Sequence, residues 1–442
     1  MTVRLPSLVT TVGTLLTLLV FTTYAEAQPT PTLTTLYNFD NGSSTDGFSP
    51  NSALVFSGGL FYGTSAYGGP GACPYGCGTL FSLAPPTEPG GSWSETVLHF
   101  FSAREGAYPN GVTLGPNGVL YGTTSSGGSS NQGTVFALTP PSNGNPAYLK
   151  VLHTFTGGSD GATPNAGVVI GKSGLLYGTT SLGGTANQGT VFSLAPGASG
   201  GVATETVLYS FNFANVNDGY GPRAGVVIGH DGVLYGTTEF GGNGPCISGS
   251  DQTIGCGTVF ALTPPKSPDG SWTETILHNF TSGGDGGDPN GLIIGEGDVL
   301  YGTTYGESLP PISGGTAFSL TPPSSTGGTW TETVLHTFGG GADGIAPIAS
   351  LVFALDPSGH PMLYGSTSLG GLQCNGGTVY SLTPPHSPGG GWTEKVVYTF
   401  DGCIADEEAG PNGLMVGKGG VIWGTRGVGG TMLGGTAFSL IP

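Results

Sequence analysis

Short apolar runs alternate with glycine-rich turns along almost the whole chain, and one pattern of them repeats. In residues 119–136, VLYGTTSSGGSSNQGTVF, two apolar runs flank a Gly/Ser loop. The arrangement occurs seven times, and its Tyr-Gly-Thr position recurs every 56 to 66 residues. The copies of this position begin at Tyr62, Tyr121, Tyr177, Tyr235, Tyr301, Tyr364 and Trp423. Such a period is typical of propellers and solenoids, because one unit cannot bury its own faces and needs neighbours on both sides.

Each unit contains four segments that alternate or form an apolar run bounded by Gly or Pro, which predicts four short strands. In order, the segments read like AGVVIG, VLYGTT, GTVF and ETVLHTF. In the fourth segment we expect every second residue from Trp330 to Phe338 to lie on one face, including His336, with Leu335 on the other. Four antiparallel strands make one propeller blade, and seven blades lie within the usual range.

The two ends of the array are complementary. The N-terminal segment 33–39, LTTLYNF, is of the fourth type, whereas the C-terminal segment that starts at Gly435 is of the third type. One blade is therefore built from both termini, which removes free strand edges. The sequence predicts an all-β fold: a seven-bladed β-propeller of four-stranded antiparallel blades in residues 33–442, closed by the N-terminal strand that completes the last blade.

The first 27 residues have the features of a secretory signal peptide. They contain one positive charge at Arg4, an apolar run from Leu8 to Phe21 and an Ala-Glu-Ala motif that ends at Ala27. The run of about 14 residues is shorter than the roughly 20 that a membrane span requires. We expect cleavage after Ala27, a short linker at 28–32, and a mature monomer that is secreted, periplasmic or at the cell exterior, without membrane insertion.

Composition and charge restrict the partners. The net charge is −18 with nine Lys and Arg residues, so a phosphate backbone would be repelled, which excludes nucleic acid and anionic membranes as partners. Six cysteines together with an export signal predict three disulfides, Cys73–Cys77, Cys246–Cys256 and Cys374–Cys403. A zinc site is the less favoured alternative, because no histidine stands at ligand spacing from these pairs.

The ordered motifs G-x-LYGTT-x-x-GG, GTVF-x-L-TP, LHxF and DG-x-x-P resemble the GloVer tandem-repeat family of exported bacterial proteins. The resemblance covers residues 33–442, with departures at WGTRG from Trp423 and GESLPPISGGTAF from Gly306. It implies a repeat domain of no established activity, often attached to the cell exterior by another C-terminal segment. The sequence is also loosely similar to quinoprotein propeller repeats, but it lacks their tryptophan-closing pattern.

One slot of the fourth segment holds either histidine or tyrosine. The slot contains His99, His153, His278 and His336, and in the other copies Tyr37, Tyr209 and Tyr398. Because the fourth strand is outermost, neighbouring copies should be roughly 20 Å apart. Metal bonds of about 2 Å cannot bring several of them to one ion, so we expect packing between blades.

An acidic residue in the motif [D/E]-G-x-x-P follows every fourth segment. The seven acids are Asp46, Glu105, Asp160, Asp218, Asp285, Asp343 and, in a degenerate copy, Glu407. In one interpretation each carboxylate accepts backbone N–H groups in its own turn. In the other, the acids form a carboxylate rim near the axis that binds Ca²⁺ or a polyhydroxyl ligand.

The loops between the second and third strands vary just before their Gly-Gly, where Tyr67, Phe240 and Tyr305 are aromatic. Variation within a regular array is where binding specificity usually sits, although such side chains also fill gaps between loops. We therefore expect a contact face formed by these aromatic residues and the acids.

Catalytic motifs are weak or absent in the sequence. There is no H-E-x-x-H, Walker loop or C-x-x-C-H, and the two G-x-S-x-G matches, from Gly157 and Gly197, sit in glycine-rich turns with no helix to follow. The sequence assigns no catalytic residue and no certain cofactor. It favours an exported propeller that binds or scaffolds a protein or glycan at its loop face. The alternative is an extracellular carbohydrate-active or quinone-dependent enzyme that uses the rim carboxylates.

Overall fold

The computed structural model describes the chain from residue 30 to residue 442 with several gaps, and Pro31–Pro442 form one compact unit. The gaps are 42–44, 89, 143, 198–202, 215–217, 248–252, 268–269, 307–313, 326, 357, 372–374, 386, 388–389 and 401–409. The predicted signal peptide lies outside the described residues. In the described part of the chain, no helix is long and apolar enough to cross a membrane.

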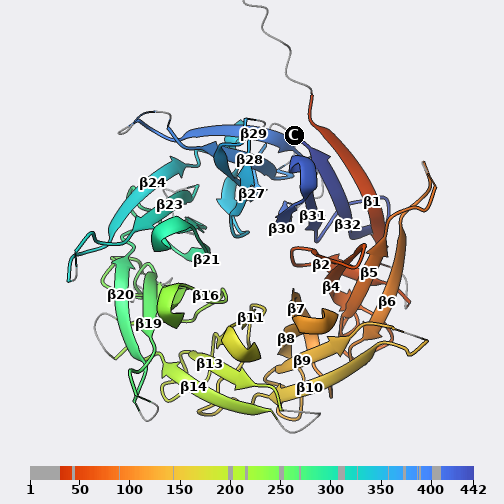
Figure 1. Cartoon of the computed structure of the whole chain (residues 1–442), viewed down its shortest axis with the longest axis horizontal. Coiled ribbons are helices and arrows are strands. Elements are labelled where there is room, and N and C mark those ends of the chain that lie inside the picture. Colours follow the sequence, from red (N-terminus) through yellow and green to blue (C-terminus); the bar gives the residue numbers. More distant parts are fainter. Residues whose placement is uncertain are drawn as a thin grey trace, which may run out of the picture. The chain divides into compact units, whose positions relative to one another are not determined.

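The compact unit is a ring of seven four-stranded antiparallel blades around a central opening, which confirms the predicted fold (Figure 1). The innermost strands are β2 (Gly47–Pro50) with β3 (Val55–Ser57), β7 (Ala107–Leu114), β11 (Val169–Ile170), β16 (Val227–Ile228), β21 (Pro289–Ile294), β25 (Ile345–Pro347) with β26 (Val352–Leu355), and β30 (Pro411–Val416). The second strands are β4 (Leu60–Gly68), β8 (Leu120–Ser126), β12 (Leu176–Thr180), β17 (Leu234–Thr238), β22 (Leu300–Thr304), β27 (Pro361–Leu369) and β31 (Ile422–Arg426).

The outer half of each blade consists of a third and a fourth strand. The third strands are β5 (Thr79–Ala84), β9 (Thr134–Thr139), β13 (Thr190–Ala195), β19 (Thr258–Thr263), β23 (Thr316–Thr321), β28 (Thr378–Thr383) and β32 (Leu433–Ile441). The outermost strands are β6 (Ser94–Phe100), β10 (Tyr148–Thr154), β14 (Thr204–Ser210), β20 (Thr273–Asn279), β24 (Thr331–Thr337), β29 (Thr393–Thr399) and β1 (Thr32–Asp40). A two-stranded sheet of β15 (Gly219–Tyr220) and β18 (Phe240–Gly241) lies outside this scheme.

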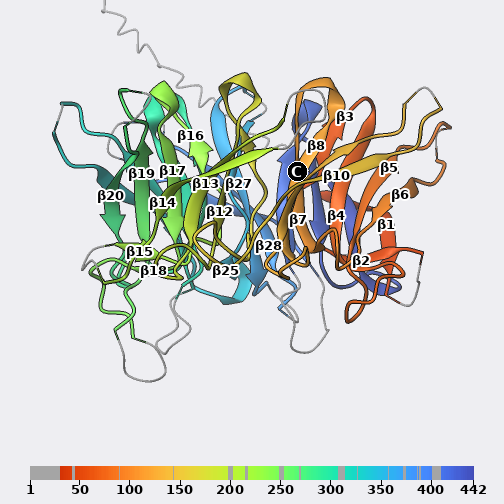
Figure 2. The same cartoon turned by 90° about the horizontal axis from the view of Figure 1, so that it is seen from below.

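The ring has two different ends, which Figure 2 shows from the side. We call the end with β15, β18 and the connections between blades the loop face. We call the opposite end, where the first and second strands of a blade are joined, the turn face. The joining turns described as 3-10 turns are η1 (Pro116–Gly118), η2 (Lys172–Gly174), η4 (His230–Gly232), η5 (Glu296–Asp298) and η7 (Lys418–Gly420); η6 (Gly341–Asp343) lies instead in a connection on the loop face.

The N-terminal strand closes the ring, as the complementary ends predict. Strand β1 pairs antiparallel with β32, from Thr32 opposite Ile441 to Asp40 opposite Leu433. It is the outermost strand of the seventh blade, whose other three strands come from the C-terminal end. Leu36 and Phe39 of β1 are buried in the core. Closure thus supplies the seventh blade with its outer strand.

The glycine of the Tyr-Gly-Thr motif makes room for an aromatic ring on the neighbouring strand. Gly122 on β8 lies opposite Phe136 on β9, and a side chain at Gly122 would collide with that ring. The third-strand ring in this position is buried in each blade, at Phe81, Phe136, Phe192, Phe260, Phe318, Tyr380 and Phe438. The repeated glycine therefore has a packing role.

Every outermost strand contains a β-bulge one residue before its His or Tyr, and here the predicted alternation is wrong. On β24, Val334 pairs with Phe318 whereas His336 pairs with the adjacent Ala317, so the extra residue, Leu335, interrupts the period. A bulge re-aims the side chains that follow it. As a result Glu332 faces the preceding blade and His336 the following one.

Two of the three predicted disulfides are present. Cys73 and Cys77 are bonded with Cα atoms 5.1 Å apart, and Cys246 and Cys256 have the same Cα separation. Both bridges close loops on the loop face, after β4 and β18. The pair predicted for Cys374 and Cys403 lies outside the described residues.

Candidate functional site

Each predicted acid that the structure describes lies beside the His or Tyr of the outer strand that precedes it. Tyr37 Oη donates to Asp46 Oδ2 at 3.1 Å, and Tyr209 Oη to Asp218 Oδ2 at 3.0 Å. The histidine Nε2 atoms lie 3.0–3.5 Å from a carboxylate oxygen in the pairs His99–Glu105, His153–Asp160, His278–Asp285 and His336–Asp343. The degenerate copy, Glu407, lies outside the described residues.

The carboxylates also accept hydrogen bonds from their own turns. Asp46 accepts the N–H groups of Asp40 at 3.0 Å and Gly47 at 2.7 Å, and the Thr281 N–H donates to Asp285 at 2.9 Å. The six described acids are absent from the lining of the axial channel. This geometry is that of turn acids at the outer strands, and ligand or Ca²⁺ binding by them stays a prediction.

A second carboxyl group approaches most of these acids from the next blade. Burial, and then the charge of Asp46, raise the pKa of Glu95 to about 8. Burial followed by Asp160 raises the pKa of Glu205 to about 7, and burial followed by Asp218 does the same for Glu274. One oxygen, Oε1, is buried without a hydrogen-bond partner among the described residues in Glu95, Glu205, Glu274, Glu332 and Glu394. In each of these glutamates burial raises the pKa of the carboxyl group, and a second acid adds to the effect.

We call the interface between two neighbouring blades a seam. In the remaining two seams, both the acid of the connection and the residue at the glutamate position of the next outer strand are different. Where the acid of the connection is Glu105, the next outer strand carries Leu149 in place of the glutamate, and Leu33 occupies the same register position after Glu407. The longer acid is thus matched by an apolar neighbour and the shorter acid by a second carboxyl group. The sequence contains this correlation, but only the ring shows which residues face each other.

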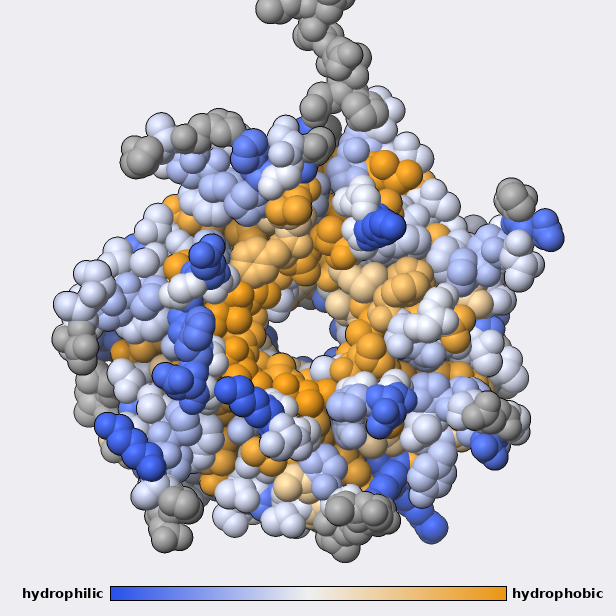
Figure 3. Space-filling model, viewed as in Figure 1, coloured by the Kyte–Doolittle hydropathy of each residue, from blue (hydrophilic) through white to orange (hydrophobic). Residues whose placement is uncertain are grey.

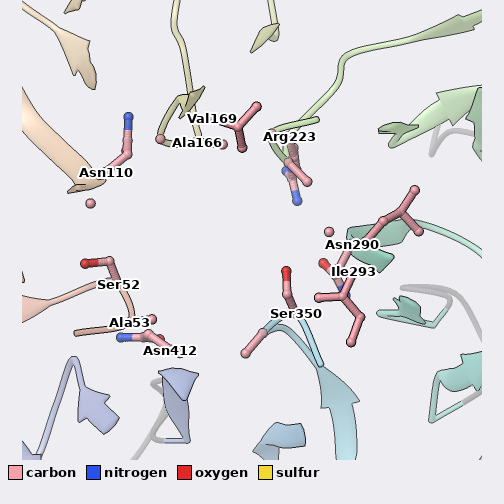
Figure 4. Close-up of a pocket in the computed structure, with 18 of the residues that line it drawn as sticks. Ser52, Ala53, Asn110, Ala166, Val169, Arg223, Asn290, Ile293, Ser350 and Asn412 are labelled. Carbon is pink, nitrogen blue, oxygen red and sulfur yellow. The ribbon is translucent and has the colours of Figure 1, made fainter. Parts of the chain in front are cut away.

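The axial channel is lined by the innermost strands and has a volume of about 600 Å³. The residue after the proline of each connection lies in its wall, and in five of seven copies it is asparagine: Asn51, Asn110, Asn165, Asn290 and Asn412. Four of them, Asn51, Asn110, Asn290 and Asn412, donate to the proline carbonyl of the following blade at 2.6–2.9 Å. Figure 4 shows Asn110, Asn290 and Asn412 around the opening, so this ring of amides ties neighbouring blades together.

The turn-face end of the channel is apolar. Val112, Val169, Val227, Ile293 and Val352 contribute to its wall. Figure 3 shows apolar residues around the central opening on the side seen in Figure 1.

The amide ring is interrupted at Ile348 and, between the third and fourth blades, by a charged residue. Arg223 takes the asparagine position there, and its Nε lies 2.6 Å from Glu239 Oε2. Asn165, its neighbour in the ring, donates to Ser181 Oγ at 3.1 Å instead of to a proline carbonyl. Arg223 is the one Lys or Arg residue that lines the channel among the described residues, and Figure 4 shows it at the wall.

A pocket of about 350 Å³ opens on the loop face at this interruption. Tyr220 and Phe240 stack there with ring centroids 5.2 Å apart, and Phe213 packs against Tyr220 at 5.1 Å. The wall also contains Asn165, Asn187, Gln188, Leu182, Arg223 and Glu239. The pocket therefore combines an aromatic wall with amide and charged groups.

Glu239 in the pocket wall and Asp288, which interacts with it from outside the wall, have raised pKa values. Burial raises the pKa of Glu239 to about 7, with Asp288 adding to the effect and Arg223 opposing it. Burial also raises the pKa of Asp288 to about 6 despite the charge of Arg223. Glu239 forms an ion pair with Arg223, the charge of Arg223 also acts on Asp288, and carboxyl groups with raised pKa values cluster at functional sites.

The sequence predicted this pocket only in part. Phe240 lines it, whereas Tyr67 belongs to another cluster, with ring centroids 5.6 Å from Tyr108 and 6.1 Å from the exposed Tyr75. The Tyr305 N–H donates to the Asp288 carbonyl at 2.9 Å, and Tyr305 does not line the pocket. Sequence reasoning missed Arg223, Glu239 and Asp288, although the first two are departures from the Pro-Asn and Tyr-Gly-Thr-Thr-Ser consensus of the repeat.

The profile of the Gloeobacter/Verrucomicrobia repeat matches three overlapping stretches, residues 20–169, 144–267 and 247–442. Together they span nearly the whole chain and confirm the resemblance carried by the repeated motifs. Among curated proteins, none matches the sequence.

Several solved structures are similar to this chain at low sequence identity, with TM-scores below 0.5. A putative oxidoreductase (glucose dehydrogenase) from Thermus thermophilus is 14% identical, with a TM-score of 0.42 over 75% of this chain and 95% of its own. Trypanosoma rangeli sialidase in complex with sialic acid is 11% identical, with a TM-score of 0.43 over 93% of this chain and 59% of its own. The extracellular domain of a putative one-component system from B. thetaiotaomicron is 10% identical, with a TM-score of 0.49 over 92% of this chain and 42% of its own.

Proposed function

We propose that this chain, which belongs to the Gloeobacter/Verrucomicrobia repeat family, is an exported binding propeller whose ligand is a glycan held at the loop-face pocket between the third and fourth blades. The observation that carries the proposal is the coincidence, at one place, of two departures from the repeat with an aromatic pair. Arg223 interrupts the amide ring, Glu239 pairs with it, and Tyr220 and Phe240 form an aromatic wall beside them.

The chemistry of the pocket suits a sugar. The C–H face of a pyranose ring packs on an aromatic ring, and its hydroxyl groups need donors and acceptors close by. Phe240 and Tyr220 supply the aromatic surface. Asn187, Gln188 and Glu239 supply the hydrogen-bonding groups. Export agrees with the two disulfides, since such bonds persist mainly in oxidising compartments.

A glycan array probed with the mature chain tests the proposal, and the repeat itself supplies conservative variants. Arg223→Asn combined with Glu239→Ser restores the consensus residues of other blades and should abolish binding while leaving the melting temperature unchanged or higher. Phe240→Ala should weaken binding about tenfold or more, because it removes the stacking wall.

Phe56→Ala is the matched control, since Phe56 is an exposed aromatic residue on the turn face, 51% accessible. Binding that survives the double variant, or that falls equally in the control, would contradict the site. If the chain instead captured an envelope protein that carries no glycan, the ligand would be a protein and the glycan proposal would be wrong.

A catalytic role is the second candidate, because Glu239 and Asp288 both have raised pKa values beside Arg223. A carbohydrate-active enzyme places two such carboxyl groups around the scissile bond. Turnover of polysaccharides that is lost in Glu239→Gln, with binding retained, would favour this candidate. A quinone-dependent enzyme would instead show cofactor-dependent oxidation of sugars.

A further inference from the structure

The seams between blades bring together side chains that could ligate a metal, and one seam gathers them closely. The bulge on each outer strand aims its His or Tyr at the next blade, the connection supplies an acid, and the next outer strand supplies a glutamate. In the seam between the fifth and sixth blades these are His336, Asp343 and Glu394. One ligand atom from each lies within 4.8 Å of the other two, and no other described trio of His, Cys, Asp or Glu is gathered in this way.

The geometry of this trio differs from that of its equivalents. His336 Nε2 lies 3.0 Å from Asp343 Oδ1, whereas the corresponding nitrogen and oxygen are 3.4 Å apart at His153 and Asp160 and 3.5 Å apart at His278 and Asp285. Ligands on one tetrahedral Zn²⁺ ion, with bonds of about 2.0–2.2 Å, lie about 3.4 Å from each other. The His336 and Asp343 atoms are already within this separation, and no two of the three ligand atoms are more than 4.8 Å apart.

This seam also contains an unsatisfied oxygen, as do the seams of the four equivalent glutamates. Glu394 Oε1 is buried and has no hydrogen-bond partner among the described residues, and a carboxylate oxygen of Glu394 lies within 4.8 Å of the ligand atoms of His336 and Asp343. A cation between the two carboxylates would satisfy this oxygen and remove the repulsion. The His336 and Asp343 side chains are 23% and 25% exposed, so water can reach the fourth position.

We propose that His336, Asp343 and Glu394 form a Zn²⁺ site that cross-links the fifth and sixth blades, with water as the fourth ligand. One imidazole and two carboxylates are a ligand set that zinc accepts. Each blade pair contributes its own three ligands, so the distance between histidines of different seams is no obstacle. The site is separate from the loop-face pocket and does not depend on the function proposed for it.

The test uses the full mature chain after chelator treatment. Titration with ZnCl₂ by calorimetry should show one saturable site, and CoCl₂ should give the visible bands of a tetrahedral ion. Zn²⁺ should also raise the melting temperature, because it binds the folded state.

The repeat again provides variants that preserve packing. His336→Tyr places the residue found at Tyr37 and Tyr209 in the slot, and Glu394→Leu places the residue found at Leu149. Each should weaken Zn²⁺ binding at least about 100-fold while leaving the metal-free melting temperature within a few degrees. The control, His278→Tyr, changes the equivalent slot in the preceding seam and should retain the site.

Absence of saturable Zn²⁺ binding, or equal binding by His336→Tyr and the native chain, would overturn the proposal. So would an equal loss in His278→Tyr, since the site would then not lie in this seam.

Discussion

Replacing Glu95 by leucine should stabilise the propeller, and more at alkaline than at acidic pH. Glu95 Oε1 is buried without a hydrogen-bond partner among the described residues, and an unsatisfied buried oxygen costs about 1–3 kcal/mol. Leucine removes that atom and occurs naturally at the same strand position, at Leu149. Asp46 keeps its donors from Tyr37, Asp40 and Gly47 in the variant.

The pH dependence follows from the sign of the shift. Burial, followed by the charge of Asp46, raises the pKa of Glu95 to about 8 in the folded chain. In the unfolded chain the pKa is close to the ordinary 4.5. Between these values the unfolded state releases its proton while the folded state keeps it, so the native protein loses stability as pH rises.

Without solvent screening, one such group changes the free energy of unfolding by at most about 1.4 kcal/mol per pH unit. Because Glu95 is partly exposed, solvent screening reduces this, and we expect about 1–2 kcal/mol in total between pH 5 and pH 8.

Urea and thermal unfolding of both proteins at pH 5 and pH 8, followed by tryptophan fluorescence, would measure the difference. We expect Glu95→Leu to raise the unfolding free energy by about 1–2 kcal/mol at pH 8 and by clearly less at pH 5. Glu88→Leu, at an exposed position in the preceding turn, is the control and should change little at either pH. A variant less stable than the native chain at pH 8, or a gain independent of pH, would refute the reasoning.

Two further predictions concern closure and cross-linking. Deleting residues 28–40 removes the buried Leu36 and Phe39, each worth about 1.5–3 kcal/mol, and exposes the edge of β32, so the truncated chain should aggregate in size-exclusion chromatography. A deletion variant that stays monomeric and melts within a few degrees of the full chain would contradict ring closure. Reduction should cost only about 2–3 kcal/mol per bridge, because Cys73–Cys77 and Cys246–Cys256 join residues only 4 and 10 positions apart. Peptide mapping without reductant should recover these two pairs and the predicted Cys374–Cys403, and a Cys77–Cys246 peptide would disprove the pairing.

The architecture could be predicted because it depends on periodicity, which a single sequence displays. Seven copies, four strands per copy and complementary ends suffice to define a closed ring. The bulge at Leu335 could not be predicted, because the residues around it alternate normally in the sequence and only the pairing reveals the shift.

The candidate pocket was less accessible to sequence reasoning. Phe240 was predicted from variation in its loop, but Arg223 and Glu239 acquire meaning only when the ring brings the asparagine positions together. Glu95 and Asp46 likewise interact although they occupy different positions of the repeat and belong to neighbouring blades. Contacts of this kind depend on how blades stack, which local patterns do not encode.

The matching of acids across seams limits how such a chain can gain or lose units by duplication. Blades three to six all follow an aspartate and all present a glutamate, at Glu205, Glu274, Glu332 and Glu394. A copy of the third, fourth or fifth blade, taken with the aspartate that follows it and inserted within this run, recreates a seam that already exists. The same copy placed before the second blade would set an aspartate against Leu149, where a longer acid normally reaches. The array is therefore interchangeable in its middle and fixed near its point of closure.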